Sequence, residues 1–448
     1  MRSRIETIQH DSGEIQRYQI VEGFDWNKVD FLFPEFDKKA ITEIARLYTT
    51  NILPKNLALY GLIAFFHVPE DMDIDCPAEH SDGRSFVKNV ASSIYLNDQV
   101  KKGKIQWEGS LIVDDEKASK IIAQLEKNHL IVTVQGERPD VLFIPINAKM
   151  GFLSQQEKVP CIVNSHFFLM DPTDLDSPYC QLGTPYGLAL KNGVLMMPPL
   201  NHRPVLLVDQ QGRTTVRQVA LTSLAVEIDG IAYIHNKNAV FHFRPEERRT
   251  PIHTGTDIII TENQVIAIKR GGDTTIPMAG FVISVESLLE VRDTHVSYHG
   301  LEAYVFGIQV GPSMMEDHTM IESLTCPFYN KEKDKVPFPS TVYPLPFETA
   351  RAARIAVGTN ATGEAVLIWA EGAGKLRYKP KCDSTGCSLL ELAKFCALQG
   401  YGDILNLDGG GSAQILWEGA RHMRISDRYD PSDLEAERPV PSALVLRN

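Results

Sequence analysis

The stretch DILNLDGGGSAQIL, residues 403–416, places an aspartate and three consecutive glycines between two apolar runs. Each run is short and bounded by polar or turn residues, which is typical of a β-strand. Glycine loses more conformational freedom on folding than any other residue, so Gly409–Gly411 need a specific reason. This loop and the acid before it, Asp408, therefore guide the prediction of both fold and site.

Three explanations compete for the glycines. A tight hairpin turn needs one or two glycines, and it leaves Asn406 and Asp408 unexplained. A nucleotide phosphate loop fails, because no Gly-Lys-Ser/Thr sequence occurs and no long helix is expected after Ser412. The third is a backbone ledge without side chains that a ligand can approach, with Asp408 fixed beside it. Polar residues adjoin the glycines where strand alternation predicts buried ones, which favours the third.

Length, charge and composition limit the class of protein. The 448 residues predict two or three domains, and 43% hydrophobic and 23% charged residues are typical of a soluble globular protein. The net charge of -12 argues against nucleic-acid and membrane partners, although a local basic pocket can hold one phosphate. Neither a signal peptide nor a transmembrane run is expected. With no export signal expected, the seven cysteines favour reduced thiols in a cytoplasmic protein, and the missing signal itself favours a protein of bacterial type.

The chain is predicted to divide near residue 140. Residues 1–140 mix helical and strand patterns and are expected to form an α/β accessory lobe of unknown role. Helices are expected over residues 37–51 and 114–130, and strands over residues 130–136 and 140–146. Residues 57–66 are expected to form a buried strand or helix.

Residues 141–448 change to short apolar runs separated by turn residues. YGLALKNGVLM and DIIITENQVIAIKRGG predict hairpins, the first around Asn192-Gly193. EAVLIWAEG predicts a further strand, and SLLELAKFCALQG predicts a helix that Gly400 ends. The expected class is α+β, with mixed β-sheets and packed helices.

Several of these motifs resemble the phosphodiester glycosidase family over about residues 141–448. LNLDGGGSAQ resembles the family's signature, and ARIAVG resembles its arginine-led strand, with Arg354 in the arginine position. ERPVPSALVL resembles the closing strand, with Arg438 in place. CIVNSHFF resembles the family's INGGFF, so Asn164 and Phe168 carry over. Ser165 and His166 depart from the family, which commonly has two small residues there.

The resemblance implies hydrolysis of a sugar-1-phosphodiester or a related glycosidic bond. Arginine forks suit the departing phosphate, so Arg354 and Arg438 are expected to bind it, with N–H groups of Gly409, Gly410 and Gly411 as further donors. Asp408 is the expected carboxylate for water or for the oxocarbenium ion. The remaining substrate-binding candidates are Asn164, Asn406 and Ser412.

Other residues have two readings each. Glu391 is either a second catalytic carboxylate or an exposed helix residue, and His166 is either catalytic or a satisfied core histidine. Cys382 and Cys387, with Cys396 beyond, lack the matching ligand pair of a zinc site, so no cofactor is predicted and a divalent cation is left open. A carbohydrate or sugar phosphate is the expected partner, and the oligomeric state is left open. The competing functions are a non-catalytic sugar-phosphate or polysaccharide-binding protein and a structural protein whose glycines only relieve crowding.

Overall fold

The computed structural model describes most of the chain outside the segment between residues 34 and 158. The described residues are 1–33, 159–169, 179, 184–200, 202–244, 247–288, 291–321, 324, 350–374, 381–426, 438 and 440–448, with the short strands at 132–134 and 140–142. Those strands, β4 (Val132–Val134) and β5 (Asp140–Leu142), pair antiparallel and confirm two predicted strands. The helices predicted over residues 37–51 and 114–130 and the element predicted over residues 57–66 lie outside the described residues.

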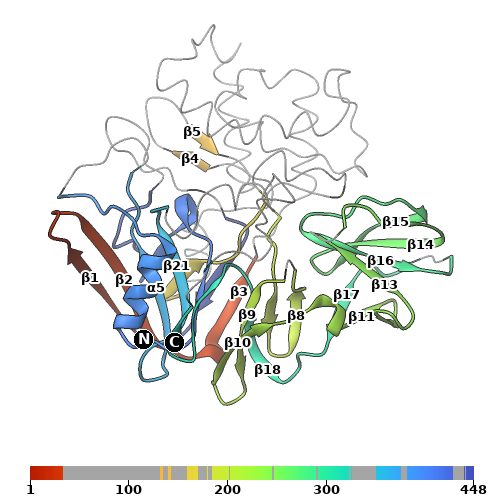
Figure 1. Cartoon of the computed structure of the whole chain (residues 1–448), viewed down its shortest axis with the longest axis horizontal. Coiled ribbons are helices and arrows are strands. Elements are labelled where there is room, and N and C mark those ends of the chain that lie inside the picture. Colours follow the sequence, from red (N-terminus) through yellow and green to blue (C-terminus); the bar gives the residue numbers. More distant parts are fainter. Residues whose placement is uncertain are drawn as a thin grey trace, which may run out of the picture.

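A seven-stranded antiparallel sheet forms one side of the molecule (Figure 1). Its order is β1 (Arg2–Gln9), β2 (Ile15–Phe24), β22 (Ala365–Ala370), β21 (Arg354–Thr359), β23 (Ile404–Asn406), β19 (Ser313–Glu316) and β20 (Thr319–Met320). Central strands β21 and β22 are buried along their whole length. Such a strand reads as a continuous apolar run, because both of its faces pack against other elements.

A four-stranded sheet shares its hydrophobic core with the seven-stranded sheet. Its order is β24 (Ile415–Trp417), β6 (Cys161–Asn164), β25 (Ala443–Leu446) and β3 (Val29–Leu32). The shared core contains Leu367 and Leu405 from the larger sheet and Val163, Ile415 and Leu444 from the smaller one, all at most 1% exposed. The polypeptide passes from one sheet to the other through the glycine loop between β23 and β24.

Three further antiparallel sheets follow in the middle of the sequence (green in Figure 1). The first has the order β10 (Thr214–Gln218), β9 (Pro204–Asp209), β18 (Tyr304–Ile308), β7 (Ala189–Lys191) and β8 (Val194–Met197). The second has the order β12 (Ile231–Ile234), β11 (Ala225–Ile228) and β17 (Val296–His299). The third has the order β13 (Val240–Phe243), β16 (Gly280–Val285), β14 (Ile252–Thr261) and β15 (Gln264–Gly272). A second core of buried side chains joins these three sheets.

The predicted hairpins are confirmed. Strands β7 and β8 pair around Asn192 and Gly193, whose φ angles of 49° and 78° are those of a primed two-residue turn. Strands β14 and β15 pair around Glu262, which has a φ of 52°.

The α+β prediction is wrong for the described residues. The one α-helix among them is α5 (Leu389–Leu398), which matches the predicted helix and is followed by Gly400 with a φ of 70°. The chain there is mostly antiparallel β-structure. Sheets bury their apolar faces against other sheets in this protein, so the expected layer of packed helices is not needed to cover them.

The first strands of the chain lie in the same sheets as the last ones. Strand β2 pairs with β22, and β3 pairs with β25 along four residues of each strand. Residues 2–32 are thus joined to the part of the chain that resembles the glycosidases. The division near residue 140 and the accessory lobe stay predictions for the residues that follow.

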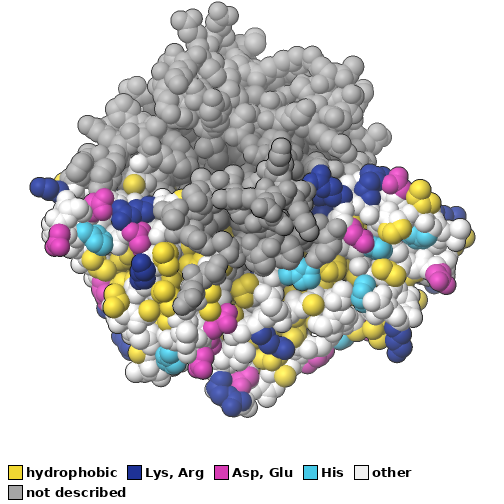
Figure 2. All heavy atoms as spheres, in the orientation of Figure 1, with side chains coloured by type: hydrophobic (Ala, Val, Ile, Leu, Met, Phe, Trp, Pro, Cys, Tyr) yellow, Lys and Arg dark blue, Asp and Glu magenta, His cyan; other side chains and the backbone are white. Residues whose placement is uncertain are grey.

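The described surface carries charges of both signs. Figure 2 shows acidic and basic side chains interspersed over the face that it presents. No helix within the described residues combines the length and the hydropathy needed to cross a membrane.

Candidate functional site

The glycine loop runs along the beginning of strand β21. The Leu407 N–H donates to the Ile355 carbonyl, and the Gly410 N–H donates to the Ala353 carbonyl, each at 2.8 Å. A short 3-10 turn, Gly410–Ser412, then turns the chain toward β24. The loop is therefore held on the seven-stranded sheet until it crosses to the smaller sheet.

Gly409 and Gly410 require glycine for different structural reasons. A Cβ on Gly409 would lie 2.7 Å from the Ala353 carbonyl oxygen, so this residue is small because two backbone segments approach closely. Gly410 has a φ of 58°, and a Cβ there would have no atom within 4 Å. Gly410 thus combines a left-handed backbone with open space, as the interpretation of a bare ledge requires.

Asp408 is buried and largely fixed through its backbone. Its N–H donates to the Ser165 carbonyl at 2.9 Å, and its carbonyl accepts from Nδ2 of Asn164 at 2.8 Å. Its carboxylate oxygen Oδ2 is buried and has no hydrogen-bond partner in the described part of the chain. Burial raises the pKa of Asp408 to about 7, although the Arg438 charge and the Gly409 N–H oppose that rise.

Asn164 connects the two ends of the loop. Its Nδ2 donates to the Asp408 carbonyl, and its Oδ1 accepts from the Gln414 N–H at 3.0 Å. Strand pairing sets Asn164 opposite Ala443 of β25, in the middle of the four-stranded sheet. The amide is thus used to hold the loop in place.

The Ser165–His166 pair, which departs from the family, is buried and hydrogen-bonded. The His166 Nε2 atom lies 3.2 Å from the Leu188 carbonyl, and Nδ1 lies 3.3 Å from Oγ of Ser442. The Ser165 hydroxyl donates to the Ser442 hydroxyl at 2.9 Å. Burial lowers the pKa of His166 to about 4, despite the Leu188 carbonyl, so the ring is neutral at pH 7. These contacts are those of a satisfied core histidine; its catalytic role stays a prediction.

The two predicted arginines differ in their surroundings. Ala356 pairs with Asn406, so extending this register by two residues sets Arg354 opposite Asp408. The Arg354 guanidinium donates to the carbonyls of Cys387 and Ala350, at 3.2 and 2.7 Å, and burial lowers its pKa. Arg438 is also buried, and its charge acts directly on the Asp408 carboxylate.

Glu391 lies on helix α5 and caps it. Its carboxylate accepts from the Ser388 N–H at 2.8 Å while the Ser388 hydroxyl accepts from the Glu391 N–H, which completes a capping box. Arg351 adds a hydrogen bond of 2.6 Å to the same carboxylate. Burial raises the pKa of Glu391, but these donors outweigh it and hold the pKa below its usual range. Glu391 is thus engaged in a structural role, and a catalytic role stays a prediction.

Sequence reasoning missed two residues of this region, Gln414 and Ser442. Gln414 is fully buried and neither atom of its side-chain amide has a partner in the described residues. Buried atoms Oδ1 of Asn406 and Oγ of Ser412 are in the same situation. The signal for Gln414 was present, because a polar side chain directly before the apolar run of β24 occupies a position where burial is expected.

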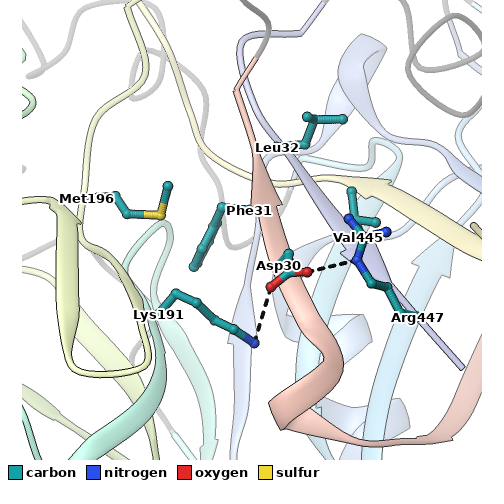
Figure 3. A pocket seen from close by; sticks show the side chains of 7 residues that line it. All are labelled: Asp30, Phe31, Leu32, Lys191, Met196, Val445 and Arg447. Carbon is teal, nitrogen blue, oxygen red and sulfur yellow. Dashed lines mark hydrogen bonds and ion pairs between the residues drawn. The ribbon is translucent and has the colours of Figure 1, made fainter. Parts of the chain in front are cut away.

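A separate pocket lies on the four-stranded sheet, beside strand β3 (Figure 3). It has a volume of about 310 Å³ and is lined by Asp30, Phe31, Leu32, Lys191, Met196, Val445 and Arg447. Asp30 lies between two cations, 3.4 Å from Lys191 and 2.9 Å from Arg447. None of the predicted site residues lines this pocket.

Metal ligands do not gather in the part of the chain that the structure describes. No group of three or more His, Cys, Asp or Glu side chains there could hold a metal ion. Cys382 is exposed, whereas Cys387 and Cys396 are buried.

Comparison with known proteins gives low-identity structural matches. A Synechocystis protein is 18% identical with a TM-score of 0.39 over 67% of this chain, which spans about half, 53%, of that protein. The zebrafish N-acetylglucosamine-1-phosphodiester alpha-N-acetylglucosaminidase catalytic domain, auto-inhibited by its pro-peptide, is 13% identical with a TM-score of 0.41, over 100% of this chain and 83% of the other. A Burkholderia pseudomallei protein is 14% identical with a TM-score of 0.44, over 100% of this chain and 96% of the other.

Curated protein sequences give no match. The sequence profile of the phosphodiester glycosidases matches residues 158–447, which is well over half of the chain. This matched range contains the glycine loop, Asp408, both arginines and the Asn164 strand. The chain belongs to the phosphodiester glycosidase family.

Proposed function

We propose that this protein hydrolyses a sugar-1-phosphodiester or a related glycosidic bond. Family membership supports the reaction class. The observation that carries the proposal is the state of Asp408, a buried carboxylate with an unpartnered oxygen and a pKa of about 7 beside the charge of Arg438. A group with a pKa near the working pH is best suited to take up and release a proton.

Hydrolysis of such a bond separates charge. The anomeric carbon gains positive charge as the bond to the phosphate oxygen lengthens, and the departing phosphodiester oxygen gains negative charge. In the proposed reaction, Arg438 stabilises the phosphate. The Gly410 N–H is already bonded to the Ala353 carbonyl, so this glycine contributes open space for the approach instead of a donor. Ionised Asp408 accepts a proton from the attacking water or stabilises the oxocarbenium ion.

The other residues position this machinery in the proposal. Asn164 holds both ends of the loop through its amide. Arg354 donates to the carbonyls of Ala350 and Cys387, so it fixes the backbone before β21 and before α5. His166 and Ser442 maintain the adjoining strand ends, which keeps the Ser165 carbonyl in place to accept from Asp408.

A non-catalytic binding protein is the second candidate. Most glycosidases use two carboxylates at the scissile bond. Here Glu391, the second predicted carboxylate, is engaged with Arg351 and the N-terminus of α5. Of the two predicted carboxylates, only Asp408 is then available to a substrate, which favours binding of a sugar phosphate without turnover.

Turnover by matched variants distinguishes the two functions. Wild type, Asp408→Asn and Glu391→Gln are incubated with a panel of methyl and aryl glycosyl phosphodiesters, and the released reducing sugar is measured. The enzyme proposal expects turnover by wild type and Glu391→Gln, and a loss of about 10²- to 10⁴-fold in Asp408→Asn. Binding of the same compounds by calorimetry with no sugar released by wild type would establish the binding protein instead.

A further inference from the structure

Gln414 has a buried amide that the fold does not use. Its side chain is 0% exposed, and its backbone N–H is bonded to Oδ1 of Asn164 at 3.0 Å. Within the described residues, Oε1 and Nε2 are both buried without a hydrogen-bond partner. The same holds for Oδ1 of Asn406, Oδ2 of Asp408 and Oγ of Ser412, so five unpartnered atoms arise from nine consecutive residues.

Gln309 shows how this fold treats a structural glutamine. It is equally buried, at 0% exposure, yet its Oε1 accepts from the N–H groups of Leu188 and Leu200 at 3.3 and 2.7 Å. Its Nε2 donates to the Arg203 carbonyl at 2.8 Å. Both glutamines are thus fully buried, but the side-chain amide of Gln309 is hydrogen-bonded and that of Gln414 is not.

An unpartnered buried amide is destabilising unless a ligand completes it. A buried polar group without a partner has lost its hydrogen bonds to water and gained none in exchange. A primary amide offers one acceptor oxygen and two donor hydrogens, which match a hydroxyl group because a hydroxyl also donates and accepts. Asn164 connects Gln414 to Asp408 through hydrogen bonds to the backbone of each. The backbones of Gln414 and Asp408 are thus held on the same side chain, next to the acid to which the proposed function assigns the sugar ring.

We propose that Gln414 is a specificity-determining residue that hydrogen-bonds to hydroxyl groups of the glycosyl unit. This inference rests on the proposed function, because it gives a sugar to the same site. It adds a residue on the sugar side, whereas Arg438 serves the phosphate. A site built to bond a hydroxyl rejects analogues that lack it, so Gln414 selects sugars by the presence of that group.

Binding measurements on a matched pair of variants test the inference. Wild type, Gln414→Met and the control Gln309→Met are titrated with glucose 1-phosphate, mannose 1-phosphate, N-acetylglucosamine 1-phosphate and inorganic phosphate. Methionine keeps the length of glutamine and removes the amide. Gln414→Met is expected to weaken the best sugar 1-phosphate by about 10- to 100-fold and to leave phosphate affinity within about twofold.

Thermal unfolding of the same proteins provides the second measurement. Gln414→Met should keep or raise the Tm, because it removes an unpartnered polar group, whereas Gln309→Met should lower it. Gln414→Asn, which keeps the amide on a shorter stem, should retain more sugar affinity than Gln414→Met.

The remaining outcomes contradict either the role of Gln414 or the proposed function. Unchanged sugar 1-phosphate affinity in Gln414→Met overturns the role of Gln414 and leaves the proposed function standing. A Tm that falls as in Gln309→Met, or a variant that does not fold, assigns Gln414 a structural role instead. Wild type that binds neither the sugar 1-phosphates nor phosphate contradicts the proposed function itself.

Discussion

The raised pKa of Asp408 makes the folded protein less stable at neutral and higher pH. Its pKa of about 7 in the folded protein compares with 3.8 for an unperturbed aspartate, so the folded state retains a proton that the unfolded state has released. The contribution of this group to stability is complete below pH 3.8 and is lost as the pH rises through 7. A raised pKa of this kind in a buried acid is typical of functional sites, which agrees with the role proposed for Asp408.

Asp408→Asn should therefore stabilise the protein at high pH. Asparagine keeps the shape of the acid and carries no charge to bury, and a shift of about three pKa units corresponds to at most about 4 kcal/mol. The free energy of unfolding, measured in urea, should rise relative to wild type more at pH 8 than at pH 5. A variant less stable than wild type at pH 8 would contradict the burial of an ionised Asp408.

The site residues were predictable to different degrees. Asp408, Asn164 and the glycines stood out because polar or glycine residues interrupted apolar runs where burial was expected. Gln414 obeyed the same rule but was hidden inside a recognised motif. Ser442 could not be found, because its contact with Ser165 and His166 depends on the pairing of β25 with β6, and strand partners are not encoded locally. Glu391 was predicted either as a second carboxylate or as an exposed helix residue, and its part in the capping box could not be read from the sequence motif alone.

At the scale of the elements, a substitution in helix α5 tests whether Glu391 has any role beyond capping the helix. Glu391→Gln keeps an acceptor for the Ser388 N–H but loses the ion pair with Arg351. We expect a loss of less than about 1 kcal/mol in the free energy of unfolding, as for a partly exposed pair, and turnover within about twofold of wild type. A decrease of a hundredfold in kcat with unchanged stability would restore Glu391 as a catalytic acid.

The glycine loop offers a comparison between neighbouring residues. Gly409→Ala places a Cβ 2.7 Å from the Ala353 oxygen, so the loop must move off β21, whereas Gly410→Ala meets open space and only the strain of a positive φ. We expect Gly410→Ala to lose about 1 kcal/mol of stability and Gly409→Ala to lose more. Chemical denaturation of both variants measures the difference. Equal losses would show that backbone contact with Ala353 does not explain Gly409.

Turn chemistry explains why some elements could be predicted and the fold class could not. Asn192-Gly193 and Gly400 specify a hairpin and a helix end by local backbone preference alone. The covering of a sheet by another sheet, in contrast, is a tertiary choice that short apolar runs do not distinguish from covering by helices. The sequence therefore predicted packed helices as the cover of the sheets, whereas a second sheet of β3, β6, β24 and β25 packs against the seven-stranded one.

On the scale of the whole molecule, the first 33 residues complete the folding unit. Trp26 and Phe31 lie in the core that the two main sheets share, and β2 lies between β1 and β22. A protein beginning at residue 34 should therefore lose cooperative thermal unfolding, because it leaves β22 and β25 with open edges and a cavity in the core.

Circular dichroism melts of the shortened and complete proteins measure this effect. Trp26→Ala in the complete chain is the milder comparison, with an expected loss of about 3–5 kcal/mol. A shortened protein with a normal sharp transition would show that the first strands are dispensable, as expected of a separate lobe.

The pairing of β3 with β25 also determines how this protein must assemble. Asp30 and Arg447 lie 417 positions apart and still bond to each other. Contacts between such distant segments form slowly, because a large loop must close before any gain is realised. Until then, the apolar sides of the early strands are open to association with other newly made chains. Renaturation at low protein concentration should consequently recover far more material than rapid refolding of a concentrated solution.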